Sequence, residues 1–302
     1  GETSPARTLD YSKTIIIDTG VYGANWCGGS GVAGENYQNL DAVYRFDTLA
    51  EFRSFVKGGM YWKIAEALFT PDYSNPASTG ISQLLFVRAA QTASATITFA
   101  TTAGGTFEVK TLDEGKGANG TLSEAGNLIT GYGVSIVAGE DDPEKWIMKF
   151  YVGSFTGYAE DGYPIGETPE DQAAPTLVLQ SPEFNNIQTL IDWAKSDSNF
   201  ANLFVLTSNA KKEGKGTVAK NDVTTALAGK KFVLAKGGTE TYNADYMTQA
   251  LAAITGLDYS FALTDQFGEN ADSALQKQYI AHMNSQAKYT HFLFVGGYAD
   301  AA

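Results

Sequence analysis

The side chains of this sequence that could perform chemistry are few, and they lie far apart along the chain. Its two histidines are His282 and His291, and its single cysteine is Cys27. A Ser-His-Asp triad needs a serine on a sharp strand-to-helix turn, but the chain contains no G-x-S-x-G motif. One cysteine can build neither a Cys-based zinc site nor an intrachain disulfide framework. We therefore expect both histidines to be solvated or packed side chains, and we predict no catalytic residue and no metal site.

Two glycine-rich stretches come near to phosphate-binding motifs but lack their context. Residues 29–34 read G-S-G-V-A-G and so match G-x-G-x-x-G. They lie about ten residues past an expected strand at 14–18, and residues 35–39 do not open an amphipathic helix whose N-terminus could hold a phosphate. Residues 214–217 read G-K-G-T but lack the P-loop spacing. We expect surface loops at both places and no nucleotide cofactor.

Carboxylates are plentiful, but most fall in polar turns, where carboxyl groups are little perturbed. Asp265 differs because it follows an expected strand at 259–263, and sites in α/β proteins form at the carboxyl ends of strands. The acidic turn at 139–143 lacks the alternating oxygen ligands and terminal glutamate of a calcium loop. One carboxylate does not make an active site, so the residues favour a protein that is not an enzyme. An α/β enzyme or nucleotide binder that uses residues 29–34 and Asp265 stays open as the alternative.

The composition excludes several classes of partner. The chain has 302 residues, a formal net charge of −13 and a sequence pI of about 4.6. Such a surface repels phosphate backbones, so we predict no binding to nucleic acid. No run approaches the roughly 20 apolar residues of a membrane span, and residues 1–5 lack the features of a signal peptide, so we predict no membrane partner. The lone cysteine fits a protein that folds in a reducing cytoplasm.

The elements that must position these residues begin with the stretch 41–89. An alternating run at 42–46 predicts a strand, and Thr48 with Glu51 forms a T-x-x-E capping box that opens a helix. A second helix is expected over 60–69 and an apolar strand over 83–88. Residues 14–18 include three consecutive isoleucines, which predicts a strand that is buried on both faces.

Two different patterns follow along the rest of the chain. Alternating runs at 95–99, 106–111, 133–137 and 145–152 predict strands, the first two as a hairpin. From residue 176, expected strands at 176–180, 203–207, 231–235, 259–263 and 291–295 alternate with expected helices at 186–196, after Asn243 and after Asp272. The last helix should turn Leu275, Tyr279, Ile280 and Met283 inward. Such alternation implies parallel strands with right-handed helical crossovers.

These patterns together predict a mixed α/β sheet layer with an inserted compact all-β module, which is barrel-like or sandwich-like. The expected domains are an N-terminal arm at 1–13, a discontinuous α/β domain at 14–90 and 176–302, and an inserted β domain at 91–175. Residues 1–13 carry no periodic pattern. They are either a disordered tail or an arm that orders only against a neighbour.

Four segments occur in an order that is more informative than any of them alone. They are residues 42–55 with Glu51, Phe52 and Phe55; residues 65–69 with the strand that ends at Arg88; the glycine-asparagine turn at 115–120; and the α/β stretch from 245 to 296. Together they resemble the contractile-tail sheath proteins of bacteriophages, over about residues 14 to 297.

The resemblance implies a structural role with no cofactor. Sheath subunits stack as helical rings around the tail tube, and their contraction drives the tube through the host envelope. The implied partners are copies of the chain itself and the tail tube protein, with baseplate and tail terminator proteins at the ends. The implied location is the virion, after assembly in the host cytoplasm. Sheath subunits also add terminal arms to the sheets of their neighbours, a β-augmentation for which residues 1–18 are the candidate segment.

The sequence departs from the sheath family at its C-terminal end. Sheath proteins continue past the α/β stretch, whereas this sequence stops at Ala302. Either it is a fragment, or another chain supplies the missing part. If it is a fragment, we expect a soluble monomer that forms no tubes alone. Two further interpretations stay open. One is a sheath from a related contractile machine, such as a secretion system or a bacteriocin. The other is an adhesin-like β module, formed by residues 91–175, on a carrier.

Overall fold

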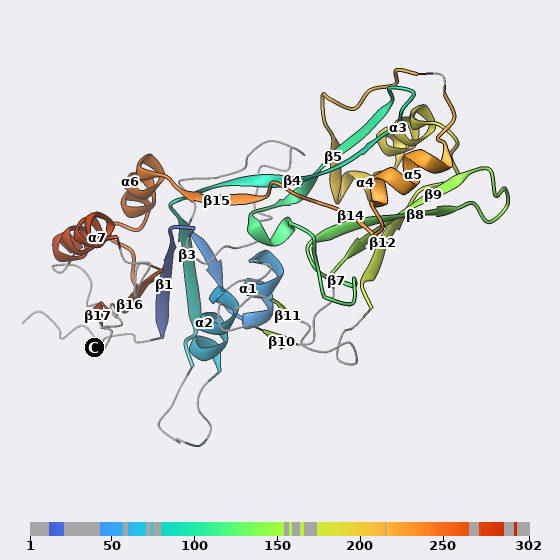
Figure 1. The fold of residues 1–302 in the computed structure, drawn as a ribbon. Helices are drawn as coiled ribbons and strands as arrows, with labels where there is room; N and C mark the ends of the chain where they lie inside the picture. The colour runs from blue at the N-terminus through green and yellow to red at the C-terminus, as the bar shows by residue number, and fades with distance from the viewer. Residues whose placement is uncertain are drawn as a thin grey trace, which may run out of the picture.

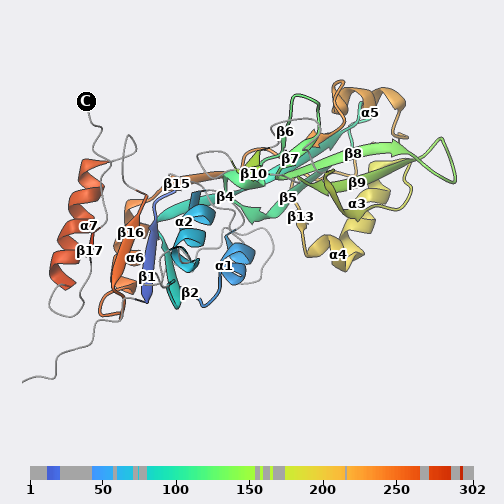
Figure 2. The ribbon, with the colours of Figure 1, turned by 90° about the horizontal axis from the view of Figure 1, so that it is seen from below.

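The structure, a computed structural model, has two parts that lie end to end (Figures 1 and 2). It describes residues 12–20, 43–56, 60–70, 74, 80–153, 157–158, 164–165, 174–214, 216–265, 272–286 and 293–294. Several features of the sequence therefore lie outside the described residues: most of the expected arm, Cys27, the loop at 29–34 and His291.

The first part, which we call the α/β layer, is built on a five-stranded sheet in the order β17-β16-β1-β3-β2. Strands β1 (Lys13–Asp18), β3 (Gln83–Arg88), β16 (Phe261–Thr264) and β17 (Leu293–Phe294) are parallel, and β2 (Tyr44–Phe46) runs antiparallel to β3. The central strand β1 is buried on both faces, as its isoleucines predict. Strand β3 has the bounds that the sequence predicts.

Helices cover both faces of this sheet. Helices α1 (Leu49–Phe55) and α2 (Met60–Phe69) share a core with Ile16, while α6 (Ala244–Ala253) and α7 (Ser273–Gln286) share the opposite core with Ile15 and Ile17. Successive strand side chains point to opposite faces, so one strand supplies both cores. The predicted capping box of Thr48 and Glu51 is present at the start of α1.

Helix α7 corrects one detail of the sequence-based prediction. Its residues Leu275, Tyr279 and Met283 are buried, as expected. Ile280 was expected beside them but is 42% exposed. The helix presents a narrower apolar stripe to the sheet than the sequence pattern predicts.

The second part, which we call the β-rich unit, contains two four-stranded sheets with the orders β13-β5-β4-β15 and β12-β9-β8-β14. The predicted strands are present as β4 (Ala90–Ala100), β5 (Thr106–Glu114), β8 (Tyr132–Ala138), β9 (Trp146–Val152), β12 (Thr176–Gln180), β13 (Phe204–Leu206) and β14 (Val233–Leu234). Strand β15 (Thr239–Tyr242), which the sequence pattern does not predict, completes the first of the two sheets. Short elements complete the described chain: η1 (Lys116–Ala118), β6 (Thr121–Leu122), β7 (Leu128–Thr130), β10 (Gly157–Tyr158) and β11 (Pro164–Ile165).

The composition of this unit differs from the predicted all-β module. Helices α3 (Ile187–Ser196), α4 (Ser198–Ala201) and α5 (Lys220–Leu227) contribute Leu190, Phe200 and Val223 to the same core as Phe99 and Phe150 from the strands. The unit is therefore mixed α/β, and its described strands form no closed barrel.

The pairing of strands after residue 176 corrects a second expectation. Strands β12, β13, β14 and β15 pair antiparallel with β9, β5, β8 and β4 of the β-rich unit, not in parallel within the α/β layer. Among the described strands that follow residue 176, parallel pairing is found at β16, which pairs with β1, and at β17, which pairs with β16. Where independent domains begin and end remains a prediction.

Candidate functional site: a buried carboxylate–arginine cluster

The carboxyl ends of three neighbouring strands bring charged side chains together at one edge of the α/β layer. Asp18 ends β1, Arg88 ends β3, and Asp265 directly follows β16. These strands are parallel and adjacent in the sheet, so their carboxyl ends meet at the same edge. The sequence placed Asp265 at such an end, and the structure confirms that position.

Hydrogen bonds join these side chains into one cluster. The Arg88 Nε donates to Asp18 Oδ2 over 2.8 Å. The Tyr61 hydroxyl from α2 lies 2.7 Å from Asp18 Oδ1 and 2.8 Å from Asp265 Oδ2. The backbone N–H of Thr19 donates to Asp265 Oδ2 over 2.9 Å, and the Thr19 hydroxyl donates to Asp265 Oδ1. A phenol carries one proton, so the two carboxylates compete for the Tyr61 hydroxyl.

A third carboxylate reaches the cluster from the β-rich unit. Glu240, in β15, places Oε2 3.9 Å from Arg88 Nη2, and its side chain is buried. Gly20 lets the end of β1 approach β15 closely. Its φ is +84°, and an added Cβ would lie 3.0 Å from the Ala90 Cβ and 3.4 Å from the Thr241 backbone nitrogen. The cluster therefore lies where the two parts of the molecule join.

Burial governs the electrostatics of the cluster. Asp18 and Asp265 are 0% exposed and Arg88 is 5% exposed. Burial, and then the charge of Asp18, raise the pKa of Asp265 to about 6, although its hydrogen bonds from Thr19 and Tyr61 act in the opposite direction. Burial and the two adjacent carboxylates raise the pKa of Tyr61 well above its ordinary value. Tyr61 is therefore a neutral hydrogen-bond donor.

The chemistry open to this cluster is limited by its enclosure. A carboxyl group with a pKa near 6 could serve as a general acid or base, but it must lie within hydrogen-bond reach of a substrate. The hydrogen bonds described above tie Asp265 to Thr19 and Tyr61, and it has no exposed surface. Among the described residues, no group of three or more His, Cys, Asp or Glu side chains could hold a metal ion. The geometry is that of a buried structural junction.

The structure does not bring the other candidate residues to this cluster. The His282 ring lies in α7, where burial lowers its pKa, and its Nε2 has no hydrogen-bond partner among the described residues. The acidic turn at 139–143 joins β8 to β9. Two of its carboxylates form ion pairs with lysines. The Asp142 Oδ2 lies 3.6 Å from Lys145 Nζ, and the Glu140 Oε1 lies 3.9 Å from Lys149 Nζ. Pairs of this length on the surface contribute little to stability.

Sequence reasoning missed most members of the cluster. It gave Asp18, Tyr61 and Arg88 no site role. A signal was present in both strands, because each ends an otherwise apolar run with a charged residue: K-T-I-I-I-D for β1 and Q-L-L-F-V-R for β3. Once the two strands are known to be adjacent, the charged residues that end them predict a buried ion pair.

The fold and the cluster define a mixed α/β protein whose principal charged site is closed to solvent. No described helix is both long enough and apolar enough to cross a membrane. No protein-family model and no curated protein matches the sequence.

Among solved structures, the chain is similar at the level of the fold to sheath tail proteins. One is a sheath tail protein from Listeria innocua, with 11% identity and a TM-score of 0.43, over 93% of this chain and 46% of that chain. Another is a sheath tail protein from Desulfitobacterium hafniense, with 11% identity and a TM-score of 0.47, over 96% of this chain and 50% of that chain. The chain thus spans about half the length of the solved proteins that it matches.

Proposed function

We propose that this chain is a structural subunit of a contractile phage tail sheath. In this proposal it polymerises as helical rings around the tail tube, and contraction of the rings drives the tube through the host envelope. Its partners are copies of itself and the tube protein, with baseplate and tail terminator proteins at the ends of the tail. It acts in the virion by contact with other chains and catalyses no reaction.

One observation carries the proposal, which is the placement of the segments that resemble sheath proteins. Residues 42–55 form β2 and α1, residues 65–69 end α2, and Arg88 ends β3. The turn at 115–120 contains η1, and the stretch from 245 to 296 forms α6, β16, α7 and β17. All four segments thus fall on elements of the kind that the resemblance implies, and three of them share the α/β layer.

The path of the chain supports an insertion as part of this proposal. Strand β4 leaves the α/β layer directly after β3, and β15 returns antiparallel to it just before α6 (Figure 1). We infer that the segment between residues 90 and 242 is a unit inserted into the layer, with broader bounds than the sequence pattern at 91–175 indicates. An inserted unit projects from the layer and can present its own surfaces to neighbouring chains.

Antibody labelling of contractile particles tests the proposal. Antibodies raised against this chain are applied to particles from the source organism and viewed by negative-stain electron microscopy. We expect gold label along the whole length of extended tails and along the shortened sheath of contracted ones. Label confined to a baseplate or a capsid, or contractile particles without label, would refute the sheath assignment. Label on tails that lack a capsid would favour the sheath of a related injection machine.

The alternative of an α/β enzyme or nucleotide binder is tested on the chain itself. A thermal-shift screen with nucleotides and divalent metal ions measures ligand binding through linkage, because a ligand that binds only the folded state raises the melting temperature. We expect no shift. A shift of several degrees at modest ligand concentration would favour the enzyme.

A further inference from the structure

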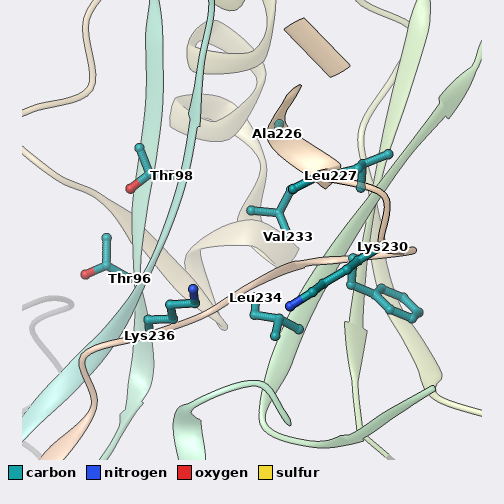
Figure 3. A pocket seen from close by; sticks show the side chains of 10 residues that line it. Thr96, Thr98, Ala226, Leu227, Lys230, Val233, Leu234 and Lys236 are labelled. Atoms are coloured by element: carbon teal, nitrogen blue, oxygen red, sulfur yellow. The ribbon is translucent and has the colours of Figure 1, made fainter. Parts of the chain in front are cut away.

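An open groove of about 390 Å³ lies on the β-rich unit, between β4 and the segment that runs from α5 to β14 (Figure 3). Its lining residues are Thr96, Thr98, Ala226, Leu227, Ala228, Lys230, Phe232, Val233, Leu234 and Lys236. Two of them are lysines and none is acidic, although the whole chain carries a net charge of −13. The groove is therefore a cationic site on an acidic molecule.

The lysines and the apolar residues divide the groove between them. The side chains of Lys230 and Lys236 point into the same gap from opposite sides (Figure 3), and both residues are exposed. Leu227, Val233 and Leu234 are half-buried and supply an apolar lining. This arrangement fits a segment that carries carboxylates on an extended or turn-shaped backbone.

The edge of β4 adds backbone hydrogen-bonding groups to the groove. The backbone of Thr96 exchanges two hydrogen bonds with Lys236, of 2.7 and 3.0 Å, so its polar groups face away from β5. Backbone polar groups along a strand alternate in direction, so those of Thr98 and Ala100 face the same way. Strand β15 pairs with β4 only from Ala90 to Ala93, and the described residues place no strand against β4 from 97 to 100. This edge can accept a partner segment.

The acidic turn between β8 and β9 has the complementary chemistry. Residues 140–144 read E-D-D-P-E, which places four carboxylates in five positions. The Glu140 side chain is 76% exposed, and the turn forms the far end of the β-rich unit in both ribbon views (Figures 1 and 2). Its backbone is held by a hydrogen bond of 2.8 Å from the Asp141 N–H to the Glu183 side chain. The turn is therefore a preformed, anionic projection.

The turn cannot reach the groove of its own chain. Strand β14 pairs with the first half of β8, at Gly133 and Val134, whereas the turn follows the end of β8 at Ala138. At about 3.3 Å per residue, roughly 15 Å of paired strand separates the two. Because β8 is hydrogen-bonded to β9 along its length, this separation is fixed. This turn can therefore occupy a lysine groove only in a second copy of the chain.

We propose that residues 139–144 of one copy, which are the acidic turn at 139–143 and the adjacent Glu144, dock into the lysine groove of the next copy. The inference rests on the sheath proposal and names one contact between neighbouring subunits. The two surfaces differ, so the contact is head-to-tail and can repeat from chain to chain, as a ring or a helical array requires. Its area is small, so a single contact is weak, and its effect grows when many are made at once.

Carbodiimide coupling tests the contact, because it joins a lysine to a carboxylate only where the two touch. Chains at natural isotope abundance and chains labelled with ¹⁵N are mixed at low ionic strength, where exposed charges are least screened. Mass spectrometry then identifies hybrid peptides that join one of each kind. We expect hybrid products that link residues 140–144 to Lys230 or Lys236.

Charge reversal supplies the matched controls. The double variant Lys230→Glu/Lys236→Glu removes the coupling amines of the groove, so alone it cannot form this product. The double variant Glu140→Lys/Asp141→Lys keeps those amines and the carboxylates of Asp142 and Glu144, and it should lower the yield of this product by about tenfold, since exposed charge pairs are individually weak but here act together. A mixture of the two variants should couple again, now through the amines introduced in the turn and the carboxylates introduced in the groove. The variant Lys195→Glu/Lys277→Glu makes the same change of charge at exposed sites outside the groove and should leave the yield unchanged.

Three results would overturn the inference: no hybrid turn-to-groove product, an equal loss in the control variant, or no recovery in the mixture. The outcome is independent of the antibody experiment. If sheaths are labelled but no cross-link forms, the proposed contact is refuted and the sheath proposal stands. The cross-link without labelled tails would leave a self-association site on a protein that is not a sheath.

Discussion

Replacing Asp265 by asparagine separates the cost of burying a charge from the contribution of its hydrogen bonds. Burial and the adjacent Asp18 raise the pKa of Asp265 from 3.8 to about 6. Each pKa unit corresponds to about 1.4 kcal/mol, so ionised Asp265 destabilises the folded state by about 3 kcal/mol. Asparagine carries no charge and keeps one oxygen, which in the place of Oδ2 accepts the Thr19 N–H and the Tyr61 hydroxyl. Its amide NH2 then faces the Thr19 hydroxyl, which can rotate and accept from it.

The sign follows from the order of titration. Below about pH 4 the carboxyl is protonated in both states, and its ionisation costs the folded state nothing. As the pH rises from about 4 to about 6, the unfolded chain releases its proton first, and the wild type loses stability at this site. Above about pH 6 the loss is complete. The stability of Asp265→Asn relative to the wild type should therefore rise by about 2.5 kcal/mol between pH 4 and pH 8.

Urea unfolding at a series of pH values, followed by tryptophan fluorescence, measures this difference. The matched control is Asp258→Asn, because the Asp258 side chain is 65% exposed and lies 3.4 Å from Lys13 Nζ. Because this pair is exposed, the difference in the free energy of unfolding between Asp258→Asn and the wild type should change by less than about 1 kcal/mol over the same pH range. A difference for Asp265→Asn that is constant with pH, or that falls as the pH rises, would refute the reasoning.

Three further substitutions probe the packing of the fold, each read from the shift of the urea unfolding curve. Arg88→Met leaves a buried carboxylate without its cation and should cost about 3–5 kcal/mol, whereas Arg53→Met, at a half-exposed pair, should cost about 1 kcal/mol or less. Equal losses of stability in Arg88→Met and Arg53→Met would contradict the prediction for Arg88. Gly131→Ala adds a Cβ 2.1 Å from a backbone carbonyl oxygen at φ +61°, and it should cost about 1–3 kcal/mol more than Gly126→Ala, where φ is +79° and no heavy atom lies within 4 Å. Asn243→Ala removes the cap of α6, which accepts N–H bonds of 3.0 and 3.1 Å, and should cost about 1 kcal/mol; no change would show that the cap is dispensable.

The α/β layer was largely predictable because its signals are local. Helix α2 and strand β3 have the bounds expected at 60–69 and 83–88, since an apolar stripe and an apolar run each specify one element. The capping box fixes the start of α1 through bonds between Thr48 and Glu51, which are three residues apart. Three consecutive isoleucines identify β1 as a strand buried on both faces. None of these inferences needs knowledge of a distant partner.

The β-rich unit was less predictable because strand pairing is not a local property. Segments 176–180 and 186–196 read as strand then helix, which is also the pattern of a parallel crossover. Strand β12 pairs with the edge of β9, which lies some 25 residues earlier in the chain. The pattern of β12 itself does not identify that partner. Strand β15 was missed altogether, because T-E-T-Y has no apolar alternation and is specified by its pairing with β4.

The candidate site shows the same limit. Asp265 was identified by its place after a strand, a rule that needs only the strand assignment. Its partners Asp18, Tyr61 and Arg88 come from separate elements, which only the order of strands in the sheet brings together. The sequence identifies charged strand ends, but it does not state that β1 lies between β3 and β16.

The position of the cluster gives its high cost a structural reason. Arg88 directly precedes β4, and Glu240 lies in β15, so the cluster surrounds the place where both strands leave the α/β layer. The N–H of Asn243 also donates to Ala89 O over 2.9 Å, which closes the pair of strands at the same point. Buried charges tolerate little displacement, because a small movement leaves a carboxylate or guanidinium unpaired in a medium of low dielectric constant. We infer that the cluster restricts movement between the two parts at the place where both strands cross. Under the sheath proposal, such a junction would keep the two parts aligned while neighbouring chains act on the subunit.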